Sequence, residues 1–291
     1  MLALLFTLKK YFSLIKFSHT IFALPFALIG FFLGITSTQS KFNLEKLLLV
    51  LVCMVMARSA AMAFNRFIDR RFDALNPRTA IREIPAGKIS PRAALILVIV
   101  SGSIFMLSAY LINILCFYLS PVALLVILGY SYTKRFTPLC HLVLGLGLAL
   151  APIGAYLAIS AQFDTLPIIF SAIVFFWVSG FDIIYSLQDD DFDKRQSLKS
   201  IPVYLGRKNA LLLSRIFHLM VTLLLFTAYY YGPFDWLYLF GCLVFISLLI
   251  YQHSLVKPND LSKVNIAFGT TNGIASVAFS VLVCLDIYIK L

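Results

Sequence analysis

Residues 65–73 read NRFIDRRFD, a dense run of charge in a chain that is otherwise strongly apolar. Asn65, Asp69 and Asp73 are spaced four residues apart, and each step of four turns an α-helix by only about 40°. The three side chains are therefore expected on one helical face. Like charges at this spacing repel one another, so we expect this face to meet a cation.

The composition predicts an integral membrane protein. Hydrophobic residues make up 61% of the 291 residues and charged residues only 13%, about half the charged share of an ordinary soluble domain. The mean hydropathy is +0.93, and a membrane-spanning helix needs about 20 apolar residues. We therefore predict an all-α polytopic bundle in the lipid bilayer, with a single transmembrane domain over residues 1–291. Nine spans are predicted, at residues 12–35, 44–64, 93–113, 118–133, 138–160, 166–187, 208–231, 234–255 and 265–289.

The distribution of lysine and arginine orients these spans. A cytoplasmic N-terminus places most of the 24 basic residues on the cytoplasmic side, as the positive-inside rule requires. We therefore predict cytoplasmic loops at about 65–92 and 188–207, which contain the charged motifs. The net charge of +11 follows from this topology, so nucleic-acid binding is not expected. The sequence indicates no obligate protein partner.

A second acidic stretch lies near the end of the sixth predicted span. Asp189 and Asp193 repeat the spacing of four, and Asp182 lies seven residues before Asp189, on the same side of a continuous helix. Two acidic faces opposite one another predict a divalent-cation site of oxygen ligands. This chemistry favours Mg²⁺, which usually binds one or two carboxylates and the phosphates of a substrate. Salt-bridged loop acids are the alternative.

The neighbouring cations fit a diphosphate, because arginine binds phosphate oxygens through two parallel hydrogen bonds. For Lys134, anchoring at the membrane interface is an equal alternative. Arg71, Arg78 and Arg92 are interpreted as loop cations that only set the topology. The predicted diphosphate contacts are Arg66, Arg70, Lys134 and Lys199.

Arg58 lies seven residues before Asn65, on the same helical face and deeper in the membrane. A charge at that depth is costly and by default indicates a function. We predict that Arg58 points into the same cavity and holds the carboxylate of a second substrate. An intramembrane ion pair with Asp182 is the alternative. His141, like the other three histidines, is interpreted as an isolated residue at a helix end or on an apolar face.

Three segments resemble the UbiA superfamily of intramembrane prenyltransferases. RSAAMAFNRFIDRRFDALNPRTAIREIPAGKIS (58–90) resembles its first signature, NxxxDxxxD, and FDIIYSLQDDDFDKRQSLKSIPVYLG (181–206) resembles its second. YSYTKRFT (130–137) is similar to a segment that members carry after their fourth helix. The resemblance covers essentially the whole chain and implies nine helices around a central cavity.

The resemblance implies Mg²⁺-dependent transfer of a polyprenyl group from an allylic polyprenyl diphosphate to an aromatic ring. The apolar wall of the bundle would then hold the prenyl tail. The implied site residues are Asp69, Asp73, Asp189 and Asp193 as catalytic ligands of the metal and diphosphate, Asn65 and Asp182 as further metal ligands, and Lys134 and Tyr185 as substrate contacts.

Within the superfamily the chain is most similar to 4-hydroxybenzoate polyprenyltransferases of quinone biosynthesis. IKFSHTIFALPFALIG (15–30) and LGLGLALAPIGAYLAIS (144–160) resemble a bacterial subgroup, which implies the bacterial inner membrane. The ubiquinone enzymes carry a polar residue where this chain reads GLGLALAP (145–152), so an aromatic acid of a menaquinone route is the alternative acceptor. A cation-coupled transporter is the alternative of another class. The clustering of acids at one membrane face, without repeated halves, favours the enzyme over it.

Overall fold

The computed structural model describes residues 10–289 except 12 and 16, and for 17–19 the backbone alone. Within this part of the chain, nine helices are long and apolar enough to cross a membrane. The predicted all-α polytopic fold is therefore confirmed. In chain order the elements are the 3₁₀-helix η1 (Phe17–Phe22), α2 (Leu24–Thr38), α3 (Leu44–Leu75), α4 (Pro91–Ile112), α5 (Ile114–Thr133), α6 (Cys140–Ser160), α7 (Thr165–Ser186), α8 (Asp190–Arg195), α9 (Ile201–Tyr231), α10 (Trp236–Leu255), the π-helix η2 (Ile266–Thr271) and α11 (Asn272–Tyr288).

Helix α3 continues past the predicted end of its span at residue 64. Asn43 caps its start by accepting a hydrogen bond from the Lys46 N–H, and helical hydrogen bonding carries on to Leu75. The first acidic motif is therefore helical, as its spacing predicted. The predicted loop at 65–92 is too long, because only residues 76–90 lie between α3 and α4. The predicted first span starts at residue 12, which lies outside the described residues.

Helix α9 begins before its predicted start at residue 208, so the predicted loop at 188–207 is also too long. Ser200 accepts a hydrogen bond from the Val203 N–H, and Pro202 occupies the first turn, both of which favour a helix start. Gly206 then interrupts the helix with φ 75° and ψ 161°. Glycine adopts this conformation without the steric cost that a Cβ would bring.

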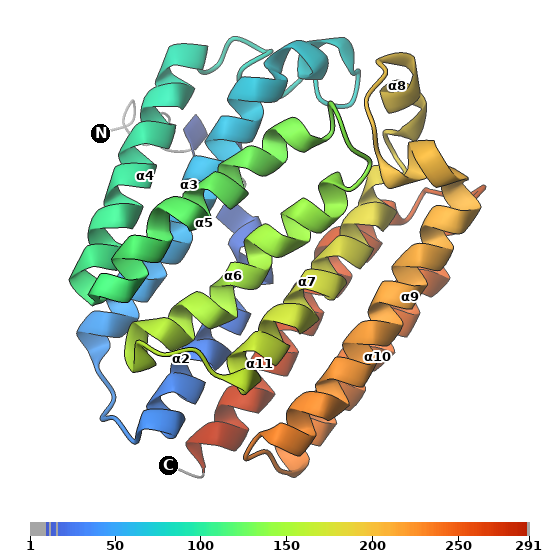
Figure 1. Cartoon of the computed structure of the whole chain (residues 1–291). Helices are drawn as coiled ribbons and strands as arrows, with labels where there is room; N and C mark the ends of the chain where they lie inside the picture. Colours follow the sequence, from blue (N-terminus) through green and yellow to red (C-terminus); the bar gives the residue numbers. More distant parts are fainter. Residues whose placement is uncertain (1–9, 12, 16, 290–291) are drawn as a thin grey trace.

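Helix α7 packs between α6 and α9, while α2 packs against α6 and α11. The fully buried Trp177 on α7 anchors this core. The centroid of its indole ring lies 5.3 Å from the ring centroid of Phe26 and 5.5 Å from that of Phe245. Its Nε1 donates a hydrogen bond to Asn272 Oδ1. The loops after α3 and α5 and the short helix α8 lie together at one end of the bundle, the upper end in Figure 1. The two acidic motifs therefore meet at the same end.

Candidate active site

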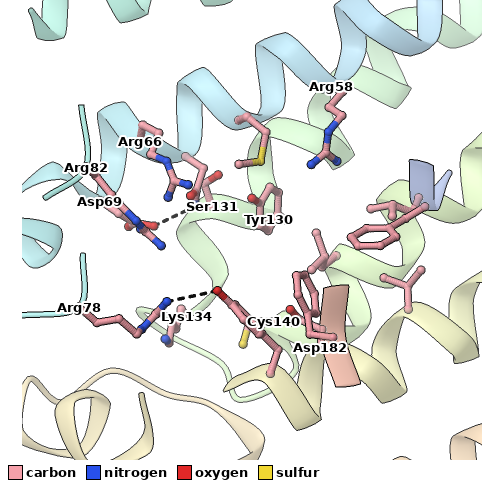
Figure 2. A pocket seen from close by; sticks show the side chains of 18 of the residues that line it. Arg58, Arg66, Asp69, Arg78, Arg82, Tyr130, Ser131, Lys134, Cys140 and Asp182 are labelled. Carbon is pink, nitrogen blue, oxygen red and sulfur yellow. Dashed lines mark hydrogen bonds between the residues drawn. The ribbon is translucent and has the colours of Figure 1, made fainter. Parts of the chain in front are cut away.

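A cavity of about 570 Å³ lies between α3, α5, α6 and α7, close to the end where the motifs meet. Figure 2 shows Arg58, Arg66 and Asp69 entering it from α3, with Arg78, Lys134 and Asp182 across from them. Polar side chains therefore line opposite walls of one space. The predicted site residues that line it are Arg58, Asn65, Arg66, Asp69, Lys134, Asp182 and Tyr185.

The first motif presents its acids from the last turns of α3. Asn65 Nδ2 donates to Asp69 Oδ2 at 2.9 Å, so the two side chains share one face, as their spacing predicted. Asp69 Oδ1 accepts from Arg135 Nη2 at 3.2 Å. Asp73 is buried and its Oδ1 accepts from Arg82 Nη1 at 2.6 Å, while Oδ2 has no hydrogen-bond partner among the described residues. This face therefore carries two carboxylates that are each held by one arginine.

The second motif does not lie on a continuous helix. Helix α7 ends at Ser186 and α8 begins at Asp190, so Asp182 and Asp189 do not share a helical face, and that part of the prediction is wrong. Asp189 lies at the turn between the helices, where its carboxylate accepts from Asn76 Nδ2 at 3.1 Å and from Arg78 Nε at 3.0 Å. The loop after α3 thus holds the second motif in place.

Asp193 on α8 is fully buried, and its Oδ2 lies 2.6 Å from Lys134 Nζ. Its Oδ1 finds no hydrogen-bond partner within the described residues. An unpartnered buried carboxylate oxygen costs free energy unless a donor or a cation reaches it. Asp73 Oδ2 and Asp193 Oδ1 therefore fit a bound cation.

Each of the four acids predicted to be catalytic has its own basic partner. Within the described chain, no group of three or more His, Cys, Asp or Glu side chains is arranged to hold one metal ion. The protein's own cations therefore relieve the repulsion that the spacing indicated. The four pairs are Asp69 with Arg135, Asp73 with Arg82, Asp189 with Arg78, and Asp193 with Lys134.

Lys134 and Asp189 keep their charge because of these ion pairs. Burial lowers the pKa of Lys134, but the nearby Asp193 carboxylate outweighs it, and the pKa is raised overall. Burial raises the pKa of Asp189, but the hydrogen bonds and charge of Arg78 outweigh it, and the pKa is lowered overall. Both groups are therefore ionised at neutral pH.

Arg78 is a site residue that the sequence interpretation missed. Arg78 does more than set the topology, because it lines the cavity, pairs with Asp189 and donates to the Tyr185 hydroxyl at 3.2 Å. Arg82 and Arg135, for which the sequence predicts no role in the site, also pair with its acids.

Two predicted diphosphate contacts lie elsewhere. Arg70 Nη1 donates to the Phe67 carbonyl, and its guanidinium lies over the Phe67 ring at 4.5 Å. Lys199 Nζ donates to the Phe136 carbonyl at 3.1 Å. Both side chains are satisfied locally, and neither lines the cavity.

Arg58 and Asp182 line the cavity without forming the alternative ion pair. Asp182 Oδ2 lies 2.7 Å from His141 Nδ1, whereas Arg58 Nε has no hydrogen-bond partner among the described residues. The interpretation of His141 as an isolated residue is therefore wrong, and so is that of His218 and His253, whose ring nitrogens lie 2.9 Å apart. His141 is 2% exposed and bonded on both ring nitrogens.

An apolar chamber of about 340 Å³ adjoins the polar cavity, between α3, α4, α5 and α6. Its walls include Met54, Phe105 and Ile127. The polar cavity and the apolar chamber meet where their walls share five side chains, those of Arg58, Met62, Tyr130, Leu144 and Leu148.

Comparisons of the sequence and of the structure with known proteins agree on one family of relatives. Residues 23–279 match the UbiA prenyltransferase family. The chain is 31% identical to the 4-hydroxybenzoate octaprenyltransferase of Aeromonas salmonicida, over 83% of each chain. A UbiA homolog from Aeropyrum pernix has 31% identity and a TM-score of 0.80, over 94% of this chain and 98% of that one. A UbiA homolog from Archaeoglobus fulgidus bound to DMAPP and Mg²⁺ shares the fold at 22% identity and a TM-score of 0.75, over 96% and 99% of the two chains.

Proposed function

The chain belongs to the UbiA prenyltransferase family, and we propose that this membrane enzyme transfers a polyprenyl group from an allylic polyprenyl diphosphate to an aromatic acid such as 4-hydroxybenzoate, in quinone biosynthesis. One observation carries the proposal: a polar cavity lined by carboxylates and by arginine and lysine side chains adjoins an apolar chamber. An amphipathic donor with a diphosphate head and a prenyl tail needs both environments. The same acceptor is named in the curated relatives.

The reaction exchanges one bond for another. The bond between C1 of the prenyl group and the diphosphate oxygen breaks, and both electrons leave with the diphosphate. A ring carbon of the acceptor then forms a bond to C1, and the proton on that carbon leaves to restore aromaticity. In the overall balance this proton is released with the diphosphate. Negative charge grows on the leaving group, so fixed positive charges around it accelerate the step.

The four ion pairs would supply the carboxylates that bind a metal and the basic side chains that bind a diphosphate. Asp69, Asp73, Asp189 and Asp193, with Asn65 beside Asp69, would hold Mg²⁺, which supplies charge stabilisation to the departing diphosphate when bound. Their basic partners would move to the phosphate oxygens and free the carboxylates for the metal. Arg66 is also placed for this role, because it is buried, lines the cavity and has an unpartnered Nε.

The apolar chamber would hold the prenyl tail. Its walls are almost entirely hydrocarbon, and burial of each CH₂ of a tail contributes roughly 0.8 kcal/mol. Because the chamber meets the cavity at Arg58 and Tyr130, a tail in the chamber would place its diphosphate head among the ion pairs. We further propose that this end of the bundle faces the cytoplasm of a bacterial inner membrane, as the basic loops indicate.

Arg58 would bind the carboxylate of the aromatic acid. Its unpartnered Nε and its position on the cavity wall support this role, since a guanidinium within the membrane needs an anion or acceptors. The alternative acceptor is another aromatic acid of a menaquinone route. It is favoured by the apolar cavity face that Leu144 and Leu148 form on α6.

Membranes that contain the protein test the proposal. We expect them to transfer label from a radioactive polyprenyl diphosphate to 4-hydroxybenzoate, to lose this activity in EDTA and to regain it with Mg²⁺. Membranes with Asp69→Asn are the matched control. If purified protein in vesicles moved cations across the bilayer and left the prenyl diphosphate intact, the transporter alternative would replace the enzyme.

A further inference from the structure

His141 lies at the start of α6, buried beside the polar cavity. Its Nδ1 is 2.7 Å from Asp182 Oδ2, and its Nε2 accepts a hydrogen bond from the Ile201 backbone N–H at 3.4 Å. A ring nitrogen that accepts from an N–H carries no proton itself, so the proton is on Nδ1. His141 therefore donates to Asp182, and the first turn of α9 fixes its tautomer.

Asp182 is held on one side only. Its side chain is 20% exposed and lines the cavity, and the hydrogen bond from His141 engages Oδ2. No described residue donates to Oδ1. Unlike the four acids proposed for the metal, Asp182 has no basic partner from the loops. It is therefore a carboxylate with a free acceptor oxygen, apart from the ion pairs.

Arg58 and Asp182 come from opposite walls, α3 and α7, with Tyr130 on α5 drawn between them in Figure 2. A small aromatic ring with an anion at one end and a hydroxyl group at the other matches this arrangement. The carboxylate of such a ring meets the guanidinium, and its hydroxyl group can donate to Asp182. Donation from a phenol to a carboxylate also raises the electron density of the ring carbons beside the hydroxyl.

We propose that Asp182 accepts the hydrogen bond of the acceptor's hydroxyl group and that His141 is the positioning residue that fixes it. This inference rests on the proposed function. It gives Asp182 a role different from the metal ligation that the resemblance implied.

Two substitutions at residue 141 separate positioning from packing. In His141→Asn the side-chain amide occupies the place of Nδ1 and can still donate to Asp182, whereas in His141→Gln the amide reaches toward Nε2 instead. We expect H141Q to raise the KM for 4-hydroxybenzoate about tenfold, as for a lost hydrogen bond to a charged group. The KM for geranyl diphosphate is expected to stay unchanged, and H141N to stay within about twofold of the wild type in both constants.

Binding to the purified protein gives a readout that does not depend on turnover. The wild type is expected to bind 4-hydroxybenzoate more tightly than benzoate, by calorimetry, and this preference should collapse in H141Q and in Asp182→Ala. Adding H141Q to D182A should have no further effect, because the histidine acts only through the carboxylate. Gel filtration and thermal unfolding check that each variant is folded.

Several outcomes overturn the inference: equal behaviour of H141N and H141Q, a rise in the KM for geranyl diphosphate, or an unchanged preference for 4-hydroxybenzoate in H141Q. If the wild type transfers prenyl groups to 4-hydroxybenzoate but H141Q keeps the preference over benzoate, only the role of His141 is contradicted. A wild type that transfers nothing contradicts the proposed function. If that inactive protein still prefers 4-hydroxybenzoate over benzoate through His141, the assignment of the binding site survives on its own.

Discussion

Arg78 and Asp189 are 111 residues apart in the sequence and are joined by two hydrogen bonds, from Nε to Oδ1 and from Nη2 to Oδ2. The same arginine donates to the hydroxyl of Tyr185. A two-pronged contact fixes orientation as well as distance. This pair therefore connects the loop after the first motif to the turn that carries the second.

Replacement of Arg78 is expected to lower transfer strongly. Arg78→Ala and Arg78→Lys both lose the two-pronged contact, because a lysine cannot reproduce the fork of a guanidinium. Hydrogen bonds to charged groups contribute about 1.5–3 kcal/mol, so we expect kcat/KM for the prenyl diphosphate to fall about 10- to 100-fold. Arg71 is exposed on the same stretch of basic residues, and Arg71→Ala should keep nearly full activity. Similar losses in the two alanine variants would indicate a general effect of charge.

Replacing Asp189 is expected to affect activity far more than replacing its neighbour Asp190. Asp189 pairs with Arg78 beside the cavity, whereas Asp190 accepts two hydrogen bonds from Arg207 on α9. Asp189→Asn should therefore abolish label transfer without preventing membrane insertion, since it removes a proposed metal ligand and no apolar packing. Asp190→Asn should keep most of the activity and serves as the control. Near-full activity in D189N would remove Asp189 from the metal site.

The ion pair of Arg78 with Asp189 should make stability depend on pH in one direction. Arg78 lowers the pKa of Asp189 below its ordinary value, which is about 3.9. The pair therefore stabilises the fold above about pH 4, and this contribution disappears as the pH falls through the lowered pKa. The difference in Tm between the wild type and Arg78→Met should be constant from pH 7 to about 5 and shrink below about 4. A difference that grows toward acid pH would contradict the pairing.

Gly206 is expected to be intolerant of a side chain. Its φ of 75° with ψ of 161° falls in a region almost exclusive to glycine, and a Cβ there would meet no atom within 4 Å. Any loss of folding stability in Gly206→Ala therefore comes from backbone strain, of the order of 1–3 kcal/mol. The expected result is a lower Tm and weaker 4-hydroxybenzoate binding, because the first turn of α9 holds His141 through Ile201. Gly129→Ala in α5 also meets no atom within 4 Å, and helix propensity should leave it neutral or slightly stabilised.

The residues of the site differ in how well the sequence could predict them. Helical spacing alone places Asn65 and Asp69 on one face, and the hydrogen bond between them agrees. The contact of His141 with Asp182 depends on the register of α6 against α7, which no local spacing reports. Arg78 depends on the conformation of a loop. The turn after Ser186, which divides the second motif between two helices, is likewise not indicated by the spacing of its acids.

The apolar chamber should set which donors the enzyme prefers. Ala123 on α5 lines it, so Ala123→Phe places a ring where a prenyl tail would lie. We expect the KM for long polyprenyl diphosphates to rise by about tenfold or more, while that for geranyl diphosphate changes little, because overpacking costs about 1–3 kcal/mol. Leu125 on the same helix is 73% exposed, and Leu125→Phe adds the same ring on the outer face as a control. Equal effects on long and short donors would place the tail elsewhere, since only a residue beside the distal part of the tail can discriminate by length.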